Sequence, residues 1–124
     1  MRLINSCVLG IDAAWTVHQP SGIALVQRTK TCWGCLAVAP SYEAFIAQAS
    51  GQAWDPEQKA RGSTPDPAAL LQASQQLAGA ELSCVSVDMP LATTPITRRR
   101  AADTAISSRF GPKGCTVHLS LIHI

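Results

Sequence analysis

The stretch VLGIDAAW, residues 8–15, has the apolar composition of a buried β-strand but carries a carboxylate in its middle. Transferring an unpaired carboxylate into an apolar interior costs on the order of several kcal/mol or more. Asp12 is therefore expected either at a solvated strand end or beside a positive charge. The rest of the chain indicates which kind of sheet this strand belongs to.

Three strands are expected at the start of the chain, over residues 7–15, 23–27 and 31–38. The segment QPSG at 19–22 is a turn signal, since Pro presets φ and Gly tolerates a positive φ. The segment RTK at 28–30 is a short polar connection. Short connections between consecutive strands favour an antiparallel meander.

Two helices are expected after the meander. Ser41 is a suitable N-cap for the first, which has an apolar stripe at helical spacing and ends at Gly51. Asp66 caps the second, with Pro in its first turn, and Gly79 ends it. The polar residues 52–64 between them read as a long loop.

A fourth strand is expected over residues 84–88, and a last helix over 98–109 with Thr97 as its cap. Because helices precede this strand, it should lie parallel to an earlier one. The predicted fold is α/β: a mixed sheet made of a three-strand antiparallel meander and a parallel fourth strand, with helices packed on it. The first strand would be central, between the second and the fourth.

Asp88 ends the fourth strand as Asp12 interrupts the first. Neighbouring parallel strands lie about 4.8 Å apart, so two carboxylates at similar heights would face each other. A cation between them would relieve their repulsion, and Mg²⁺ or Mn²⁺ suits a site of few carboxylates, waters and phosphate oxygens. The competing interpretation is structural: Asp12 caps a local turn or pairs with an arginine.

The net charge of +2 is unevenly distributed, because residues 98–118 hold five Lys or Arg and one acid, a balance of +4. Arg98, Arg99 and Arg100 could hold phosphates of a nucleic acid. The alternative is a solvated helix face in which Arg99 pairs with Asp103 at i, i+4. That pair would compete with any role of Asp103 as a metal ligand.

Five cysteines without a secretion signal predict reduced, mostly buried thiols. Cys32 and Cys35 form a C-x-x-C, but in a strand residues i and i+3 point to opposite faces, which predicts structural cysteines. Trp15 and Trp33 are expected to pack against the sheet. No apolar run approaches the roughly 20 residues of a membrane span, so we expect a cytoplasmic protein without a membrane partner.

The segments VLGIDAAWTVHQPSGIALV and VSVDMPLATTPITRRRAADTAISSRFGPKGCTVH resemble the bacterial family called domain of unknown function 429, a predicted RNase H-like nuclease. The resemblance implies an RNase H-like fold in which acidic residues on the first and fourth strands bind divalent metal and promote phosphodiester hydrolysis. Asp12 and Asp88 occupy those positions, and Asp103, in the segment R-R-x-A-D, is implied as a third catalytic residue.

The family continues past the equivalent of His118, so residues 1–118 are expected to form the N-terminal part of one RNase H-like domain, incomplete at its C-terminus. The last six residues, LSLIHI at 119–124, resemble the translated end of a transposase adapter used in preparing sequencing libraries. We expect this tail to be non-native.

The first functional hypothesis is a metal-dependent nuclease, with Asp12, Asp88 and Asp103 as catalytic residues. Two alternatives stay open. One is a non-catalytic nucleic-acid or ligand-binding module with the same fold. The other is a nucleotide-binding domain of the actin-like or sugar-kinase type, whose first strand also carries G-I-D but is normally followed by a glycine-rich phosphate hairpin.

Overall fold

The computed structural model describes residues 6–14, 16–89 and 98–114. The chain divides into two compact units, Met1–Met89 and Pro90–Ile124, and each is described by itself.

The described residues form four strands, three α-helices and one short 3-10 helix. None of these helices is long and apolar enough to cross a membrane. In chain order the elements are β1 (Cys7–Asp12), β2 (Gly22–Arg28), β3 (Trp33–Ala39), α1 (Tyr42–Ala49), α2 (Pro67–Ala78), β4 (Cys84–Asp88), α3 (Ala101–Phe110) and η1 (Gly111–Lys113).

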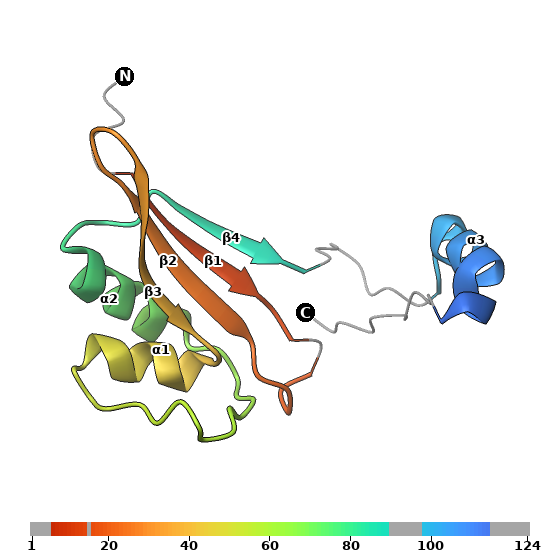
Figure 1. The fold of residues 1–124 in the computed structure, drawn as a ribbon, viewed down its shortest axis with the longest axis horizontal. Helices are drawn as coiled ribbons and strands as arrows, with labels where there is room; N and C mark the ends of the chain where they lie inside the picture. Colours follow the sequence, from red (N-terminus) through yellow and green to blue (C-terminus); the bar gives the residue numbers. More distant parts are fainter. Residues whose placement is uncertain (1–5, 15, 90–97, 115–124) are drawn as a thin grey trace. The chain divides into compact units, whose positions relative to one another are not determined.

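The four strands form one mixed sheet in the order β3-β2-β1-β4 (Figure 1). β1 pairs antiparallel with β2, and β2 pairs antiparallel with β3, with a register shift between Leu25 and Val26. β4 returns after the two helices and pairs parallel with β1. The predicted α/β class, the meander, the parallel fourth strand and the central position of β1 are all confirmed.

The caps predicted for α1 and α2 are present. Ser41 accepts a hydrogen bond from the backbone N–H of Ala44 at 3.1 Å, and Asp66 accepts one from that of Ala69 at 3.1 Å. Gly79 ends α2 with φ +62°, a left-handed conformation that favours glycine. These local signals set where α1 and α2 begin and where α2 ends.

The core lies between one face of β1–β3 and the helices α1 and α2, which lie on that side in Figure 1. Alternate strand residues point into it, as the two-residue period of a strand requires. Phe45 from α1 is fully buried in the same core cluster as Leu9 and Leu25 of the sheet. The buried apolar residues are Cys7, Leu9, Ile23, Leu25, Ala37, Ala39, Tyr42, Ala44, Phe45, Leu70 and Ala73.

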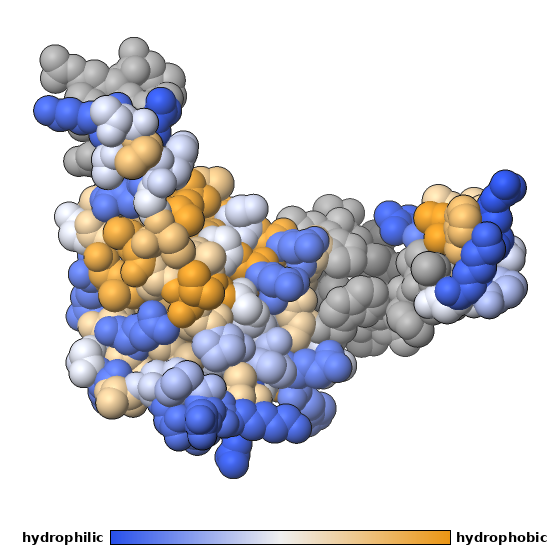
Figure 2. Space-filling view, in the orientation of Figure 1, coloured by the Kyte–Doolittle hydropathy of each residue, from blue (hydrophilic) through white to orange (hydrophobic). Residues whose placement is uncertain are grey.

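The opposite face of the sheet has no covering layer among the described residues of the first unit. Apolar side chains are therefore exposed along β3, where Trp33 is 53% and Val38 66% exposed, and Figure 2 shows this apolar surface. Trp33, which was expected to pack against the sheet, is accordingly half-exposed on this open face. Trp15 lies outside the described residues.

Two of the differences from the predicted element boundaries concern the proposed site residues. β1 ends at Asp12 rather than at residue 15, so the carboxylate closes the strand instead of interrupting it. α3 begins at Ala101 rather than at Arg98, with Arg100 as an N-cap residue that makes no side-chain cap hydrogen bond. The predicted cap, Thr97, lies outside the described residues.

The prediction of mostly buried thiols is wrong for three of the four cysteines in the described ranges. Cys32, just before β3, and Cys35 and Cys84, within β3 and β4, are exposed. Cys7 is buried in the core, and this burial raises the pKa of its thiol. Cys115 lies outside the described residues.

Candidate functional site

Asp12 and Asp88 end neighbouring parallel strands. Asp12 is the last residue of β1, Asp88 is the last residue of β4, and the two are paired in register. In-register residues of parallel strands project from the same face, and the strands lie about 4.8 Å apart. The sequence hypothesis that two distant aspartates meet at one sheet edge is therefore supported at the level of the backbone.

Both aspartates lie on the open face of the sheet. Leu9 and Ile11 of β1 contact the core, so Asp12 projects to the other side together with Gly10. Ser86 is the register partner of Gly10 and shares this face with Asp88. A shallow cavity of about 450 Å³ lies here, lined by Gly10, Ile11, Asp12, Gly22, Ile23, Ala24, Val38, Ala39, Ser86 and Asp88.

The floor of this cavity is made of small side chains. Gly10, Ala24 and Ser86 place at most a methyl or hydroxymethyl group between the strands and the solvent. A ligand can therefore approach the backbone of the sheet beside the carboxylates. The sequence analysis did not predict that these residues form the floor. The signal was present, because Gly10, Ala24 and Ser86 each lie between two larger apolar residues of their strand.

The turn after β1 is held close to Asp12. The buried hydroxyl of Ser21 accepts a hydrogen bond from the backbone N–H of Ala14 at 2.9 Å. A second cavity, of about 340 Å³, lies between this turn and Asp12, and Gln19 and Pro20 line it. Asp12 thus borders both cavities, and the turn forms one wall of the site.

Within the described residues, Asp12 has no arginine partner of the kind that the structural interpretation required. Neither Asp12 nor Asp88 forms an ion pair there, and both side chains are exposed. Two uncompensated carboxylates side by side repel each other, and a divalent cation relieves that repulsion. The donor set fits Mg²⁺ or Mn²⁺, because such ions are commonly held by one or two carboxylates together with waters and phosphate oxygens. In residues 6–14, 16–89 and 98–114 no group of three or more His, Cys, Asp or Glu is placed to share a metal ion.

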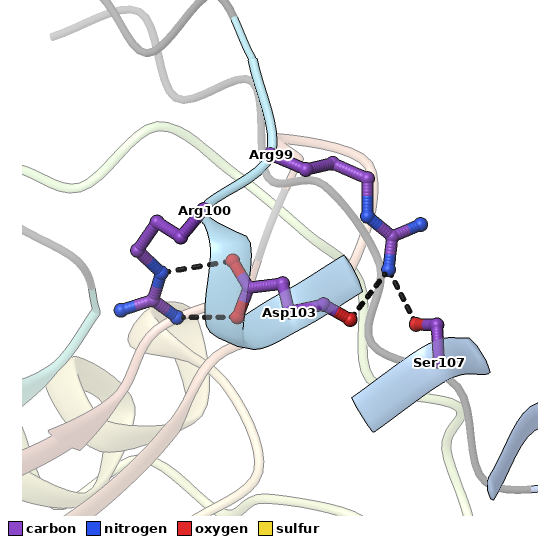
Figure 3. A network of polar contacts seen from close by, with 4 residues as sticks. All are labelled: Arg99, Arg100, Asp103 and Ser107. Carbon is purple, nitrogen blue, oxygen red and sulfur yellow. Dashed lines mark hydrogen bonds and ion pairs between the residues drawn. The ribbon is translucent and has the colours of Figure 1, made fainter. Parts of the chain in front are cut away.

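Asp103 has a different environment within the second unit. Both of its carboxylate oxygens accept hydrogen bonds from Arg100, from Nε and Nη2, each at 2.8 Å (Figure 3). This bidentate pair, at i and i+3, holds the pKa of Asp103 below its usual range. The carboxylate that was expected as a third catalytic residue is therefore neutralised by its own neighbour.

Arg99 contacts the backbone of α3 instead of the Asp103 carboxylate. Its Nη2 donates to the carbonyl oxygen of Asp103 at 3.2 Å and to the hydroxyl of Ser107 (Figure 3). The expected i, i+4 ion pair with Arg99 is thus replaced by the pair with Arg100. Arg98, Arg99 and Arg100 are exposed and precede the helix rather than forming its first turn.

The chain has no significant match among family models, curated proteins or solved structures. The functional argument accordingly depends on the residues of the site.

Proposed function

We propose that this protein is a metal-dependent phosphodiesterase acting on nucleic acid, of the RNase H-like kind. The observation that carries the proposal is the in-register pairing of Asp12 and Asp88 at the ends of two parallel strands. The resemblance of the segments around both aspartates to a family of predicted RNase H-like nucleases supports the same assignment.

The two carboxylates are the proposed metal ligands. Together they bring a charge of −2 to one edge of the sheet, which attracts a divalent cation and leaves room for waters and a phosphate oxygen in its coordination sphere. When bound, such an ion polarises the phosphate and lowers the pKa of a bound water. Without it, the same charge repels the phosphodiester, so we expect activity to depend strictly on metal.

The open face lets the substrate reach the carboxylates. A phosphodiester can be placed over Gly10, Ala24 and Ser86 without meeting a large side chain. Hydrolysis would form a bond between a water oxygen and phosphorus and break the bond to the leaving ester oxygen. The role of Asp12 and Asp88 is to hold the reacting groups in the geometry of this in-line displacement.

Asp103 and the arginines have a secondary place in the proposal. Asp103 could become a third ligand only after exchanging the bidentate contact with Arg100 for the metal. Arg98, Arg99 and Arg100 would bind the nucleic-acid backbone. Metal binding is therefore assigned to Asp12 and Asp88 alone.

The test is a nuclease assay on single- and double-stranded DNA and RNA with Mg²⁺ or Mn²⁺. We expect cleavage by the native chain, its loss in EDTA, and its loss in both Asp12→Asn and Asp88→Asn. Glu81→Gln removes the same charge at an exposed position before β4, at the opposite end of this strand from Asp88, and should retain activity. Cleavage that persists in both aspartate variants would reject the proposal.

Two other outcomes point to the alternative functions. Thermal stabilisation by metal without turnover indicates a non-catalytic binding module with the same fold. Stabilisation specific to ATP indicates a nucleotide-binding domain of the actin-like or sugar-kinase type. The residues between Asp12 and Gly22 contain no glycine, so they do not resemble the phosphate hairpin that such a domain normally has.

A further inference from the structure

A second candidate site lies where the long loop meets the turn after β1. A cavity of about 510 Å³ is formed there by one residue of the turn and five consecutive residues of the loop, namely His18, Gln58, Lys59, Ala60, Arg61 and Gly62. The sequence showed this loop only as a polar segment, because nothing local to it indicates what it contacts.

Gly62 makes the contact between loop and turn possible. A Cβ added at this position would lie 2.5 Å from the backbone N of Gln19 and 2.5 Å from the backbone O of Val17, and would also meet the carbonyl carbon of His18. These neighbours are backbone atoms that cannot rotate away. The loop is thus packed directly on the turn, and this packing brings Lys59 and Arg61 to one cavity with His18.

The cavity has a basic lining. Lys59 and Arg61 carry positive charge, and no acidic residue of the described chain lines the cavity. Within the described parts of the chain, no ion pair joins Lys59 or Arg61 to a carboxylate. Among the acids of this segment, Asp55 accepts from the N–H of Glu57 and Asp66 caps α2. Glu57 is exposed, and it forms no ion pair among the described residues.

The basic cavity is near the proposed metal site. Asp12 ends β1 and His18 lies in the turn that follows, six residues later, so their Cα atoms lie within about 21 Å of each other. A nucleic-acid strand advances about 3.4 Å per nucleotide in a duplex, so this span corresponds to at most about six nucleotides.

We infer that the cavity between the turn and the loop binds a backbone phosphate of the same nucleic acid whose scissile phosphodiester lies at Asp12 and Asp88. Lys59 and Arg61 supply the charge, with Arg61 able to form a bidentate contact to phosphate oxygens. This inference rests on the proposed function, because it names a contact that holds the same substrate. It adds a backbone contact in the first unit to those proposed for Arg98, Arg99 and Arg100, which precede α3.

The experiment measures binding of a fluorescent single-stranded oligonucleotide to the full chain in EDTA, over a series of salt concentrations. We expect Lys59→Gln combined with Arg61→Gln to weaken binding about tenfold at low salt and to reduce the salt slope by about 0.7, the contribution of one phosphate contact for single strands. Arg28→Gln combined with Lys30→Gln removes the same charge on the hairpin joining β2 and β3 and should change the affinity less than about twofold.

An unchanged affinity in the Lys59 and Arg61 variant would overturn the inference. Equal losses in both double variants would also overturn it, because they would show a response to net charge alone. Measuring in EDTA keeps the result independent of metal chemistry. If the native chain neither cleaves nucleic acid nor responds to metal, the proposed nuclease function is rejected. If the Lys59 and Arg61 variant still binds the oligonucleotide more weakly, the inferred phosphate contact stands independently of that function.

Gly62→Ala tests the cavity without changing any charge. The added methyl group must push the loop from the turn, so we expect oligonucleotide affinity to fall toward that of the Lys59 and Arg61 variant. Gly34→Ala is the matched control, since a Cβ at Gly34 meets nothing within 4 Å and should leave binding unchanged. If Gly62→Ala prevents folding, the charge variants still decide the question.

Discussion

The two faces of the sheet are built from alternate residues of the same strands, yet they serve different purposes. On the covered face, Leu9 and Leu25 are buried against Phe45 and contribute to stability. On the open face, Gly10 and Asp12 line a shallow cavity whose floor is made of small side chains. The difference shows that one strand can place a carboxylate beside an apolar core without burying it.

The largest expected effect is on the covered face. We expect Phe45→Ala to lower the free energy of unfolding by about 3–5 kcal/mol, because it removes a fully buried aromatic ring and leaves a cavity. Val38→Ala, on the open face, should change it by less than about 1 kcal/mol, since Val38 is 66% exposed. Urea unfolding measures both, and similar losses would contradict the assignment of the core.

The cysteines report the same contrast by their reactivity. We expect Cys32, Cys35 and Cys84 to be alkylated readily in the native protein, while Cys7 reacts more slowly by about a hundredfold or more because its thiol must first be exposed by local opening. Burial also raises the pKa of Cys7, which reduces its thiolate fraction. Peptide mapping after timed iodoacetamide labelling would show the order, and early labelling of Cys7 would refute it.

A smaller effect is expected at the carboxylate pair on the open face. In EDTA and low salt, Asp88→Asn should raise the free energy of unfolding by about 0.5–1 kcal/mol, the repulsion of two charges roughly 5 Å apart in water. Salt should diminish the gain. Glu81→Gln, away from Asp12, should show no comparable gain. A destabilised Asp88→Asn protein would mean that the carboxylate has a favourable partner in the metal-free state.

The smallest expected effect concerns the ion pair in α3. The contact with Arg100 lowers the pKa of Asp103, so its contribution to helix stability is present above the carboxyl's ordinary pKa and is lost as pH falls through the lowered value. Carboxyl NMR should show Asp103 titrating below about 3.9, and Arg100→Gln should return it toward that value. An unchanged titration in the variant would contradict the pairing.

Local signals predicted the elements well. Ser41 and Asp66 cap their helices as their positions indicated, and the connection lengths correctly predicted the meander and the parallel return of β4. The register that aligns Asp12 with Asp88 followed from treating the two strands as parallel neighbours. These features depend on residues close in sequence or on general rules of chain connection.

Features that depend on distant contacts were missed. One local feature was also missed: the last helix was predicted from residue 98, but the backbone becomes helical only at Ala101, where Arg100 can reach Asp103. The exposure of Trp33 and Cys35 follows from the open face of the first unit, which no layer covers within residues 6–14 and 16–89. The contact of Gly62 with the turn joins segments more than 40 residues apart, which no local pattern could reveal.

The most direct measurement is a Mn²⁺ titration of thermal stability in the native chain, Asp12→Asn, Asp88→Asn and the double variant. We expect saturable stabilisation of the native chain, about 2.7 kcal/mol when the ion is at a hundred times its Kd. Each single variant should lose nearly all of it, and the double variant should lose no more, because both carboxylates hold one ion. Stabilisation that survives in either single variant, or losses that add in the double variant, would show that Asp12 and Asp88 do not share a metal.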